Sequence, residues 1–289
     1  MIIGVLGPEG SYSEKAAKGW IARQPNLVDI DLSYYNDISE IFSAIDDKAV
    51  DIGIVPVENS IEGSVGVSLD HLLENDVTII GEIVVPIEHC LLSRGKLSGI
   101  KVILSHPQAL AQCRQFLREN FKDVEIRTTG STSHAAKLAN EFEEMAAIAS
   151  RESASMYGLD LLSENIQDRK RNSTRFIAIT TDLSEEERAS LLGGTEKQSY
   201  KTSIVVYIDR DRPGALYDIL GDFATRDINL TRIESRPSKR TLGDYVFYID
   251  LSGSLGDAII KDALHDINSK VSMLKVLGSY PGYEMPWDE

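Results

Sequence analysis

Five consecutive residues bring together side chains that can handle an anion: Asn172-Ser173-Thr174-Arg175-Phe176. The apolar segment 176–179 that follows predicts a short strand, so the polar groups are expected at the mouth of that strand. An amide, two hydroxyls and a guanidinium can hold an anion and donate hydrogen bonds to a departing oxygen. A polar loop that merely enters a strand would read the same way, because loops are polar by default. Other parts of the chain must decide between these two interpretations.

Three turns rich in Gly, Ser and Thr lie between a predicted strand and a predicted helix, at residues 7–13, 105–107 and 130–133. Ser11 or Ser13 is expected to cap the first helix, and Ser105 the second. Free backbone amides at the start of a helix favour an anion. In α/β sheets such turns lie at the carboxyl ends of the strands, where ligands bind. We therefore expect the three turns to face one ligand site, although ordinary capping also explains each of them.

Strands and helices alternate through residues 1–181, which predicts an α/β fold with a mostly parallel sheet. The predicted strands are 2–6, 51–55, 79–85, 90–92, 101–104, 124–129, 145–149 and 176–179. Predicted helices include one from 38 to 45 and one that runs from the Ser105 turn through Leu117. The first turn lacks both the dinucleotide fingerprint and the P-loop pattern, and it remains a helix N-terminus whose free amides and hydroxyls favour an anion.

The pattern changes at residues 182–200, which are acidic and then Gly-rich, and we interpret this segment as a linker. Residues 201–280 then follow the order strand, helix, strand, strand, helix, strand. This βαββαβ order is the ferredoxin-like motif. Residues 281–289 are expected to form a tail.

Composition limits the classes of protein that fit. The 289 residues are 42% hydrophobic, enough for a full core, and carry a formal net charge of −15. Such a charge disfavours nucleic acid, whose binding depends on neutralised phosphates. No apolar run is long enough to span a bilayer, and the N-terminus lacks the basic start of a signal peptide. We therefore expect a cytoplasmic protein without membrane or nucleic-acid partners, in which Cys90 and Cys113 are core residues.

The polar stretches occur in a recognisable set: 7–13, 55–63, 105–108 with Gln112, and 172–176. In order and spacing this set closely resembles the prephenate dehydratase family. In the second domain, Gly214-Ala215-Leu216 and Glu234-Ser235-Arg236-Pro237 look like the two effector motifs of the ACT regulatory module of that family. No single motif is decisive, but the set as a whole is highly specific.

The resemblance implies a catalytic domain at 1–181 with two lobes, like a type II periplasmic binding protein, followed by an ACT domain at 201–280. The first lobe would comprise about 1–78 and 173–181, and the second about 79–172. Such a protein converts prephenate to phenylpyruvate, water and carbon dioxide in phenylalanine biosynthesis. L-Phenylalanine inhibits it through the ACT domain. The family uses no organic cofactor and no metal.

The resemblance also assigns roles to individual residues. Thr174 is the expected donor to the leaving hydroxyl, and the positions that bind or polarise substrate are Asn59, Ser105 and Gln112. Arg175 is expected to pair bidentately with a substrate carboxylate or to brace its own loop. Ser11 and Ser173 are expected to add hydrogen bonds to substrate.

Thr174 needs help as a proton donor, because a threonine hydroxyl is too weak an acid to release its proton freely. It must act as a preorganised donor or relay a proton from another group. Glu58 and His106 could feed such a relay. The simpler interpretation is that Glu58 fixes the loop of Asn59 and that His106 is a solvated residue at a helix start.

The expected effector site lies in the ACT domain. Its residues would be Gly214, Ala215, Leu216, Asn229, Leu230, Glu234, Ser235 and Arg236. A helix starting near Gly214 would offer amides to an amino acid's carboxylate. Because the effector of relatives lies between two ACT domains, a homodimer or homotetramer is expected.

Two other functions fit these residues. Arogenate, in which an ammonium replaces the ketone of prephenate, is an alternative substrate. A non-catalytic protein that senses amino acids is the other, because the same fold also serves in ligand capture and a fold alone does not fix function.

Overall fold

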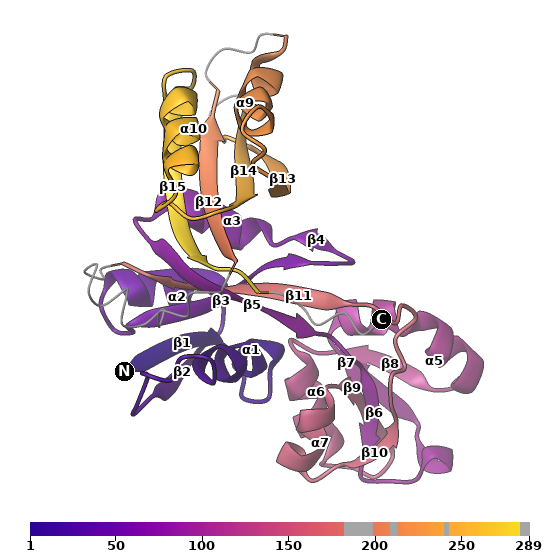
Figure 1. Cartoon of the computed structure of the whole chain (residues 1–289). Coiled ribbons are helices and arrows are strands. Elements are labelled where there is room, and N and C mark those ends of the chain that lie inside the picture. The colour runs from indigo at the N-terminus through magenta and orange to yellow at the C-terminus, as the bar shows by residue number, and fades with distance from the viewer. Residues whose placement is uncertain (182–198, 209–212, 240–242, 284–289) are drawn as a thin grey trace. The chain divides into compact units, whose positions relative to one another are not determined.

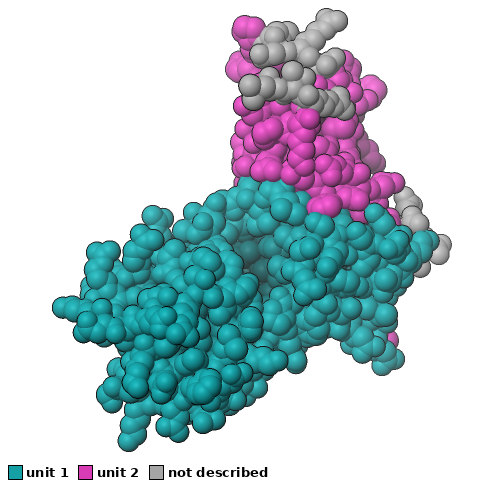
Figure 2. All heavy atoms as spheres, turned by 180° about the vertical axis from the view of Figure 1, so that it is seen from behind, with its two compact units in different colours: residues 1–22, 29–68, 83–176 teal, residues 23–28, 69–82, 177–289 magenta. Residues whose placement is uncertain are grey.

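The computed structural model describes residues 1–181, 199–208, 213–239 and 243–283. These residues fall into two compact units (Figure 2): one holds 1–22, 29–68 and 83–176, and the other holds 23–28, 69–82 and the chain from 177 onward. The second unit therefore joins three segments of the expected catalytic domain to the expected ACT domain. The expected linker lies outside the described residues apart from 199 and 200, and so do residues 284–289 of the expected tail.

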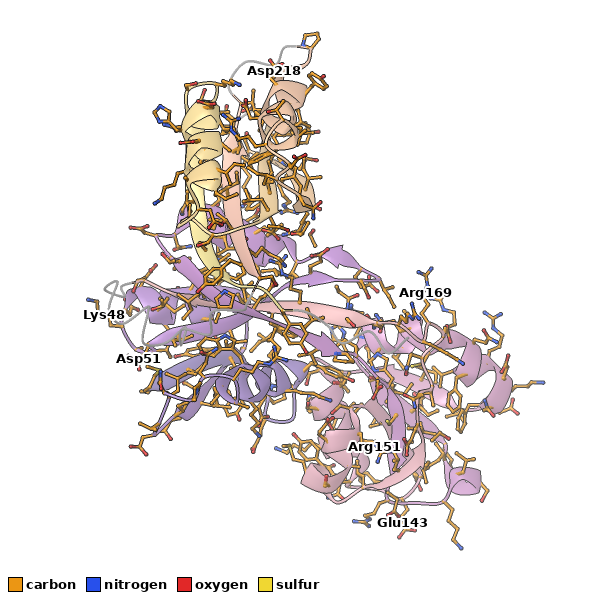
Figure 3. The ribbon with its side chains drawn as sticks, in the orientation of Figure 1. Lys48, Asp51, Glu143, Arg151, Arg169 and Asp218 are labelled. Atoms are coloured by element: carbon orange, nitrogen blue, oxygen red, sulfur yellow. The ribbon has the colours of Figure 1, made fainter. Side chains whose placement is uncertain are left out.

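The first sheet has the strand order β2-β1-β3-β11-β5, with β4 paired to β3. Its strands are β1 (Ile2–Leu6), β2 (Asp31–Tyr35), β3 (Ile52–Asn59), β4 (Gly63–Ser64), β5 (Thr78–Pro86) and β11 (Ser173–Thr180). β1 runs parallel to both β2 and β3. Asp51 lies directly before β3 (Figure 3). Its carboxylate accepts the backbone amide of Ile2 at 2.7 Å, which fixes the start of β1 beside β3. In the strand order β11 lies between β3 and β5, so the chain returns to the first sheet at the segment that carries Thr174. Figure 1 shows β11 together with β3 and β5.

Three helices accompany this sheet: α1 (Tyr12–Ile21), α2 (Ile38–Asp46) and α3 (Gly66–Glu74). Helical spacing places Ala16, Ala17 and Trp20 on one buried face of α1. The core strands carry side chains such as Ile3 and Val5 that are fully buried. Burial of this apolar surface is the main force that holds α1 against the sheet.

The second sheet has the order β10-β6-β9-β7-β8. Its strands are β6 (Cys90–Ser93), β7 (Val102–Ser105), β8 (Glu125–Thr128), β9 (Met145–Ala149) and β10 (Asp160–Ser163). Around it are the 3-10 turn η1 (Leu97–Gly99) and the helices α4 (Pro107–Gln112), α5 (Arg114–Asn120), α6 (Thr132–Ala139) and α7 (Arg151–Tyr157). Alanines of α6 pack on alanines of β9, and these small side chains let helix and strand approach closely. β7 runs parallel to β8 and β9, whereas β6 runs antiparallel to β9 and β10.

The third sheet confirms the predicted βαββαβ motif. Its elements are β12 (Tyr200–Tyr207), α9 (Ala215–Ala224), β13 (Leu230–Pro237), β14 (Tyr245–Ser252), α10 (Ala258–Asn268) and β15 (Met273–Pro281). The strand order is β13-β14-β12-β15 with antiparallel pairing throughout. Phe223 of α9 and Ile267 of α10 pack in one core cluster with Ile204 and Ile249 of the sheet.

Two predictions near Ser105 are wrong. The continuous helix ends at Gln112, because the Gln112 carbonyl accepts the amide of Asp168 at 2.7 Å instead of an amide further along the helix. A new helix, α5, starts at Arg114. The cap of α4 is His106, whose Nδ1 accepts the Gln108 amide at 3.3 Å. Ser105 is not the cap because its hydroxyl donates to the Ile148 carbonyl at 2.6 Å.

The sequence patterns also missed β2, β4 and β10. Each lies at the margin of its sheet: among the described strands β2 pairs only with β1 and β10 only with β6, and β4 has two residues. Edge strands bury little surface and so show a weak apolar pattern. Within the described part of the chain, no helix is long and apolar enough to cross a membrane.

Candidate active site

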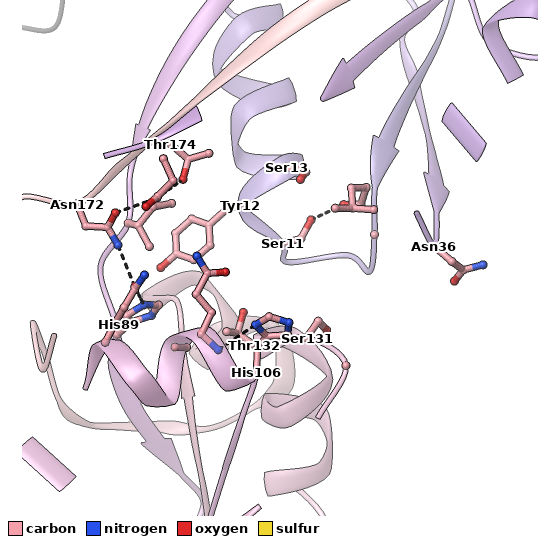
Figure 4. Close-up of a pocket in the computed structure, with 18 residues that line it drawn as sticks. Ser11, Tyr12, Ser13, Asn36, His89, His106, Ser131, Thr132, Asn172 and Thr174 are labelled. Atoms are coloured by element: carbon pink, nitrogen blue, oxygen red, sulfur yellow. Dashed lines mark hydrogen bonds between the residues drawn. The ribbon is translucent and has the colours of Figure 1, made fainter. Parts of the chain in front are cut away.

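A cavity of about 280 Å³ lies within the first compact unit (Figure 4). This volume is near the lower end of the usual range for small-molecule sites. The lining comes from both sheets and their turns: Leu6, Gly7, Ser11, Tyr12, Ser13, Asn36, Asn59, Ile87, His89, His106, Gln108, Ala109, Gln112, Gly130, Ser131, Thr132, Asn172 and Thr174. All three Gly/Ser/Thr turns contribute, so they face one cavity as expected.

Three helices begin at this cavity. Ser11 Oγ accepts the Glu14 amide at 3.2 Å and caps α1. Ser131 Oγ accepts the His134 amide at 3.0 Å and caps α6. His106 caps α4 in the same way. Helix N-termini carry partial positive charge, so their convergence makes the cavity attractive to an anion.

The lining residues of the cavity that the structure describes include no Lys, Arg, Asp or Glu. Its polar groups are hydroxyls, carboxamides and imidazoles. Attraction for an anion therefore comes from neutral donors and helix ends, in a chain whose formal net charge is −15. Such donors act at short range and specify where each anionic oxygen lies.

Asn59 is the centre of a buried hydrogen-bond network. Its Oδ1 accepts the backbone amides of Ile61 and Glu62 at 2.9 and 3.0 Å. Its Nδ2 must then be the donor to Asn172 Oδ1 and to Thr174 Oγ1, each at 2.9 Å. Gly63, with a φ of +85°, closes the turn that supplies those two amides.

The bond from Asn59 determines how the Thr174 hydroxyl is used. Because Thr174 Oγ1 accepts the hydrogen of Asn59 Nδ2, its own hydrogen is free to point elsewhere. Thr174 lines the cavity (Figure 4), so a ligand there can receive that hydrogen. This geometry makes Thr174 a preorganised donor.

The network continues into the second sheet through Gln112. Asn172 Nδ2 donates to Gln112 Oε1 at 2.9 Å, and the same oxygen lies 2.9 Å from His89 Nε2. Gln112 Nε2 has Glu62 Oε1 as a long partner at 3.4 Å. Both lobes of the expected catalytic domain thus contribute to one network.

Three expected substrate residues do not line the cavity. Ser105 is fully buried and bonded to the Ile148 carbonyl. Ser173 uses its backbone, with its amide donating to Ser60 Oγ and its carbonyl accepting the Ser60 amide. Arg175 lies 3.7 Å from Glu58, with 11% of its side chain exposed. This pairing matches the interpretation in which Arg175 braces its own loop.

Several lining residues were not among the sequence-predicted site residues. His89 and Tyr12 carry no local pattern that separates them from core residues. Tyr12 donates to the Glu88 carbonyl, and burial is the main reason that the pKa of its phenol lies far above the ordinary value. Asn172 was part of the predicted polar run, and its neighbours in sequence were the signal for it. His106 lines the cavity in addition to capping a helix.

The expected effector residues lie at two places in the third sheet and its helices. Gly214 precedes α9 with a φ of +88°, a conformation that favours glycine, and Ala215 and Leu216 open the helix. Leu230, Glu234, Ser235 and Arg236 lie on β13, the edge strand, directly after Asn229. Arg236 already has an ion-pair partner, because its guanidinium pairs with Asp70 of α3 at 3.0 Å within the same compact unit.

Comparison with known proteins identifies the family. The prephenate dehydratase model matches residues 3–184, and the ACT domain model matches residues 202–268. The chain belongs to the prephenate dehydratase family. The prephenate dehydratase of Methanocaldococcus jannaschii is 42% identical over 96% of this chain and 97% of its own.

Two solved structures resemble this chain over nearly its full length. The prephenate dehydratase of Arthrobacter aurescens, in complex with L-Phe, is 32% identical, covers 99% of this chain and 94% of its own, and has a TM-score of 0.83. A structure described as a novel type of quorum quenching acylase is 28% identical with 98% of both chains covered, and also has a TM-score of 0.83. The family therefore accounts for both the cavity-bearing part and the ACT domain of this chain.

Proposed function

We propose that this chain catalyses the decarboxylative dehydration of prephenate to phenylpyruvate. Membership of the prephenate dehydratase family indicates the reaction. One observation supports placing this reaction in the cavity. Thr174 Oγ1 accepts from Asn59 Nδ2 and so keeps its own hydrogen for a ligand in an anion-attracting cavity. A donor aimed at a leaving oxygen is what this reaction needs.

The chemistry matches the inventory of the cavity. The bond between the ring and its carboxylate breaks, carbon dioxide leaves, and the electron pair enters the ring. The ring hydroxyl departs with one proton as water, and the ring becomes aromatic. Formation of the aromatic ring supplies the driving force of the reaction. The protein therefore has to bind a dianion and assist the departure of the hydroxyl oxygen. Hydrogen bonds to charged groups contribute roughly 1.5–3 kcal/mol each, so several neutral donors suffice to hold the dianion.

Roles for the individual residues follow from their contacts. Thr174 donates to the leaving hydroxyl, and Asn59 orients Thr174. Gln112 donates to an anionic oxygen of the substrate, and Ser11 marks the helix N-terminus that receives a carboxylate. Ser105, Ser173 and Arg175 hold the surrounding backbone and Glu58 in place.

Feedback inhibition by L-phenylalanine is the regulation that accompanies this domain arrangement. The ACT domain at 202–268 and the L-Phe complex of the Arthrobacter aurescens relative support it. In this chain the effector residues would be those at the start of α9 and along β13. L-Phenylalanine added to the purified enzyme should lower the rate, and full activity at saturating L-phenylalanine would contradict this regulation.

A homodimer formed through the ACT domains is the assembly we favour. β13 is the last strand of its sheet in the described part of the chain, and Ile233 on it is 46% exposed. An open edge strand with apolar side chains is a template for a second chain. Light scattering of the intact protein should give the mass of at least a dimer. Ile233→Lys should lower the measured mass. If the wild type and Ile233→Lys both had the mass of a monomer, the proposed assembly would be contradicted.

One assay tests the proposed reaction. Purified protein is given prephenate or arogenate separately, and phenylpyruvate and phenylalanine are measured. Formation of phenylpyruvate from prephenate supports the proposal. Turnover of arogenate alone would replace prephenate by its aminated form. Turnover of neither substrate would point to a sensing protein and overturn the proposal.

A further inference from the structure

His89 is a buried histidine that the proposed reaction does not use. His89 lies between β5 and β6 in the chain, and it lines the cavity. Only 3% of its surface is exposed. Its backbone is fixed on both sides: its amide donates to Gln167 Oε1 at 2.9 Å, and its carbonyl accepts the Ile166 amide at 3.0 Å. Its ring meets the ring of Tyr12 edge-on, with the centroids 6.4 Å apart. The imidazole is therefore held in one orientation.

Hydrogen-bond directions determine which nitrogen of His89 carries hydrogen. The amides of Ile61 and Glu62 can only donate, so Asn59 Oδ1 accepts and Asn59 Nδ2 donates. Asn172 Oδ1 accepts that hydrogen, so Asn172 Nδ2 donates to Gln112 Oε1. The remaining partner of this oxygen is then also a donor.

That partner is His89 Nε2, which must carry a hydrogen to bond to Gln112 Oε1 at 2.9 Å. His89 Nδ1 is buried and has no hydrogen-bond partner among the residues that the structure describes. A hydrogen on Nδ1 would be a buried donor without an acceptor, so the ring is neutral and protonated at Nε2 alone. Two donors, from Asn172 and His89, thus hold Gln112 Oε1.

The consequence concerns the other end of the Gln112 side chain. With Oε1 held from two sides, Nε2 is directed away from Asn172 and carries two hydrogens. Within the described residues Nε2 has one weak partner, Glu62 Oε1 at 3.4 Å, which leaves hydrogen-bonding capacity for a ligand. If the amide rotated by half a turn, Gln112 would present an acceptor to an anionic ligand and repel it.

We propose that His89 is a positioning residue that, as the neutral Nε2–H tautomer, holds Gln112 so that its amino group donates to an anionic oxygen of the substrate. This inference rests on the proposed function and adds to it the group that orients the Gln112 donor. His89 acts on substrate affinity through Gln112 and does not touch the leaving oxygen.

A double-mutant cycle on KM for prephenate tests the proposal. His89→Leu should raise KM roughly 10-fold, by analogy with the 10–100-fold effect of removing a partner that orients a metal ligand. Because His89 acts through Gln112, the substitution His89→Leu should not change KM further in a protein that already carries Gln112→Leu. The double variant should therefore have the KM of Gln112→Leu. Independent, multiplying effects would overturn the proposal, and so would a wild-type KM in folded His89→Leu.

Conservative variants separate positioning from folding. Gln places an amide nitrogen where His89 Nε2 lies, so His89→Gln should keep KM near that of the wild type. His89→Asn, shorter by one methylene, should show the raised KM. A purely structural role would lower the folded fraction and hence the apparent kcat, while KM stayed unchanged. Equal KM values for the Gln and Asn variants would overturn the proposal. His134→Leu, an exposed histidine on α6, is the matched control.

A spectroscopic measurement needs no substrate. Nitrogen-15 chemical shifts of the His89 ring, assigned by comparison with His89→Gln, should show a neutral Nε2–H tautomer at pH 7.5. The Nδ1–H tautomer or a charged ring would overturn the inference even if prephenate is turned over. Conversely, the proposed function would be overturned if neither the wild type nor the His134→Leu control formed phenylpyruvate. The chemical shifts would still decide the tautomer of His89 in that case.

Discussion

Asn59 Nδ2 donates to Thr174 Oγ1 across 2.9 Å, although 115 positions separate the two residues in the chain. The bond joins the end of β3 to the start of β11, two neighbouring strands of one sheet. It also defines the chemistry of the threonine, because an oxygen that accepts from the protein has its own hydrogen available for the ligand.

Thr174→Ala removes the donor to the leaving hydroxyl. We expect kcat to fall by roughly 10²–10³-fold, the usual effect of losing one donor to developing charge in a transition state. KM should change little, because the leaving hydroxyl is neutral in the ground state. Thr174→Ser keeps the hydroxyl and should retain most of the activity. Steady-state kinetics check both variants, and an unchanged kcat for the Ala variant would remove Thr174 from the mechanism.

Asn59→Asp changes hydrogen-bond direction with almost no change of shape. The new carboxylate can only accept, so it would claim the Thr174 hydrogen that the ligand needs. It would also bring negative charge to a side chain that is 7% exposed and close to a dianion site. We expect kcat to fall about as far as in Thr174→Ala, with a raised KM in addition. If kinetics show wild-type kcat for the Asp variant, hydrogen-bond direction at Thr174 is unimportant.

Acid should destabilise the fold through His89. Burial is the largest cause that lowers the pKa of this imidazole below its ordinary value of 6.5, and the bond to Gln112 opposes the shift. The ring of Tyr12 faces the His89 ring directly, whereas Glu62 is connected to His89 through the side chain of Gln112. Because the folded state binds this proton less readily than the unfolded state, the contribution is complete above pH 6.5 and declines as the pH falls below it.

Urea unfolding at pH 7.5 and pH 5.5 measures this contribution. Wild type should lose more unfolding free energy between the two pH values than His89→Gln, which has no group to protonate there. Other titrating groups affect both proteins alike, so the comparison isolates His89. Equal losses in the two proteins would show that His89 titrates normally.

Asp70 holds the guanidinium of Arg236, an expected effector residue. Burial tends to raise the pKa of Asp70, but hydrogen bonds from Lys239 and Arg236 lower it below its ordinary value. Asp70→Asn should reduce stability by about 1 kcal/mol, since both ions are partly exposed. It should also free Arg236 for the effector, so that L-phenylalanine inhibits at a concentration about fivefold lower.

Inhibition curves for wild type and Asp70→Asn check this expectation. Glu74→Gln, on the same helix but 55% exposed, is the matched control and should leave inhibition unchanged. Inhibition by L-phenylalanine at the same concentration in Asp70→Asn and wild type would mean that the Asp70–Arg236 pair plays no part in effector binding.

Sequence patterns predicted the elements that bury much apolar surface. β1 and β9 have their expected bounds and the third sheet has its expected βαββαβ order, because their apolar runs have strand or helix periodicity. The break of the helix at Gln112 was missed, since it depends on an amide 56 positions away, at Asp168. Long-range hydrogen bonds of this kind leave no local signal.

The same distinction applies to the site. The caps of α1 and α6 were predictable, because Ser or Thr before a helix is a local pattern. The placement of Ser105 was not, because its hydroxyl is claimed by the Ile148 carbonyl of a neighbouring strand. His89 was also missed, as its role depends on the direction of hydrogen bonds that start at the backbone of Ile61 and Glu62.

The absence of charged side chains from the described lining of the cavity bears on how a turnover ends. A lysine or arginine in the wall would keep attracting an anion after the reaction. Here the departure of carbon dioxide turns a dianion into a monoanion, and the vacated donors are neutral groups that water can solvate at once. Phenylpyruvate should therefore leave readily and compete poorly with prephenate, so that bond breaking, rather than product departure, sets the pace of the cycle.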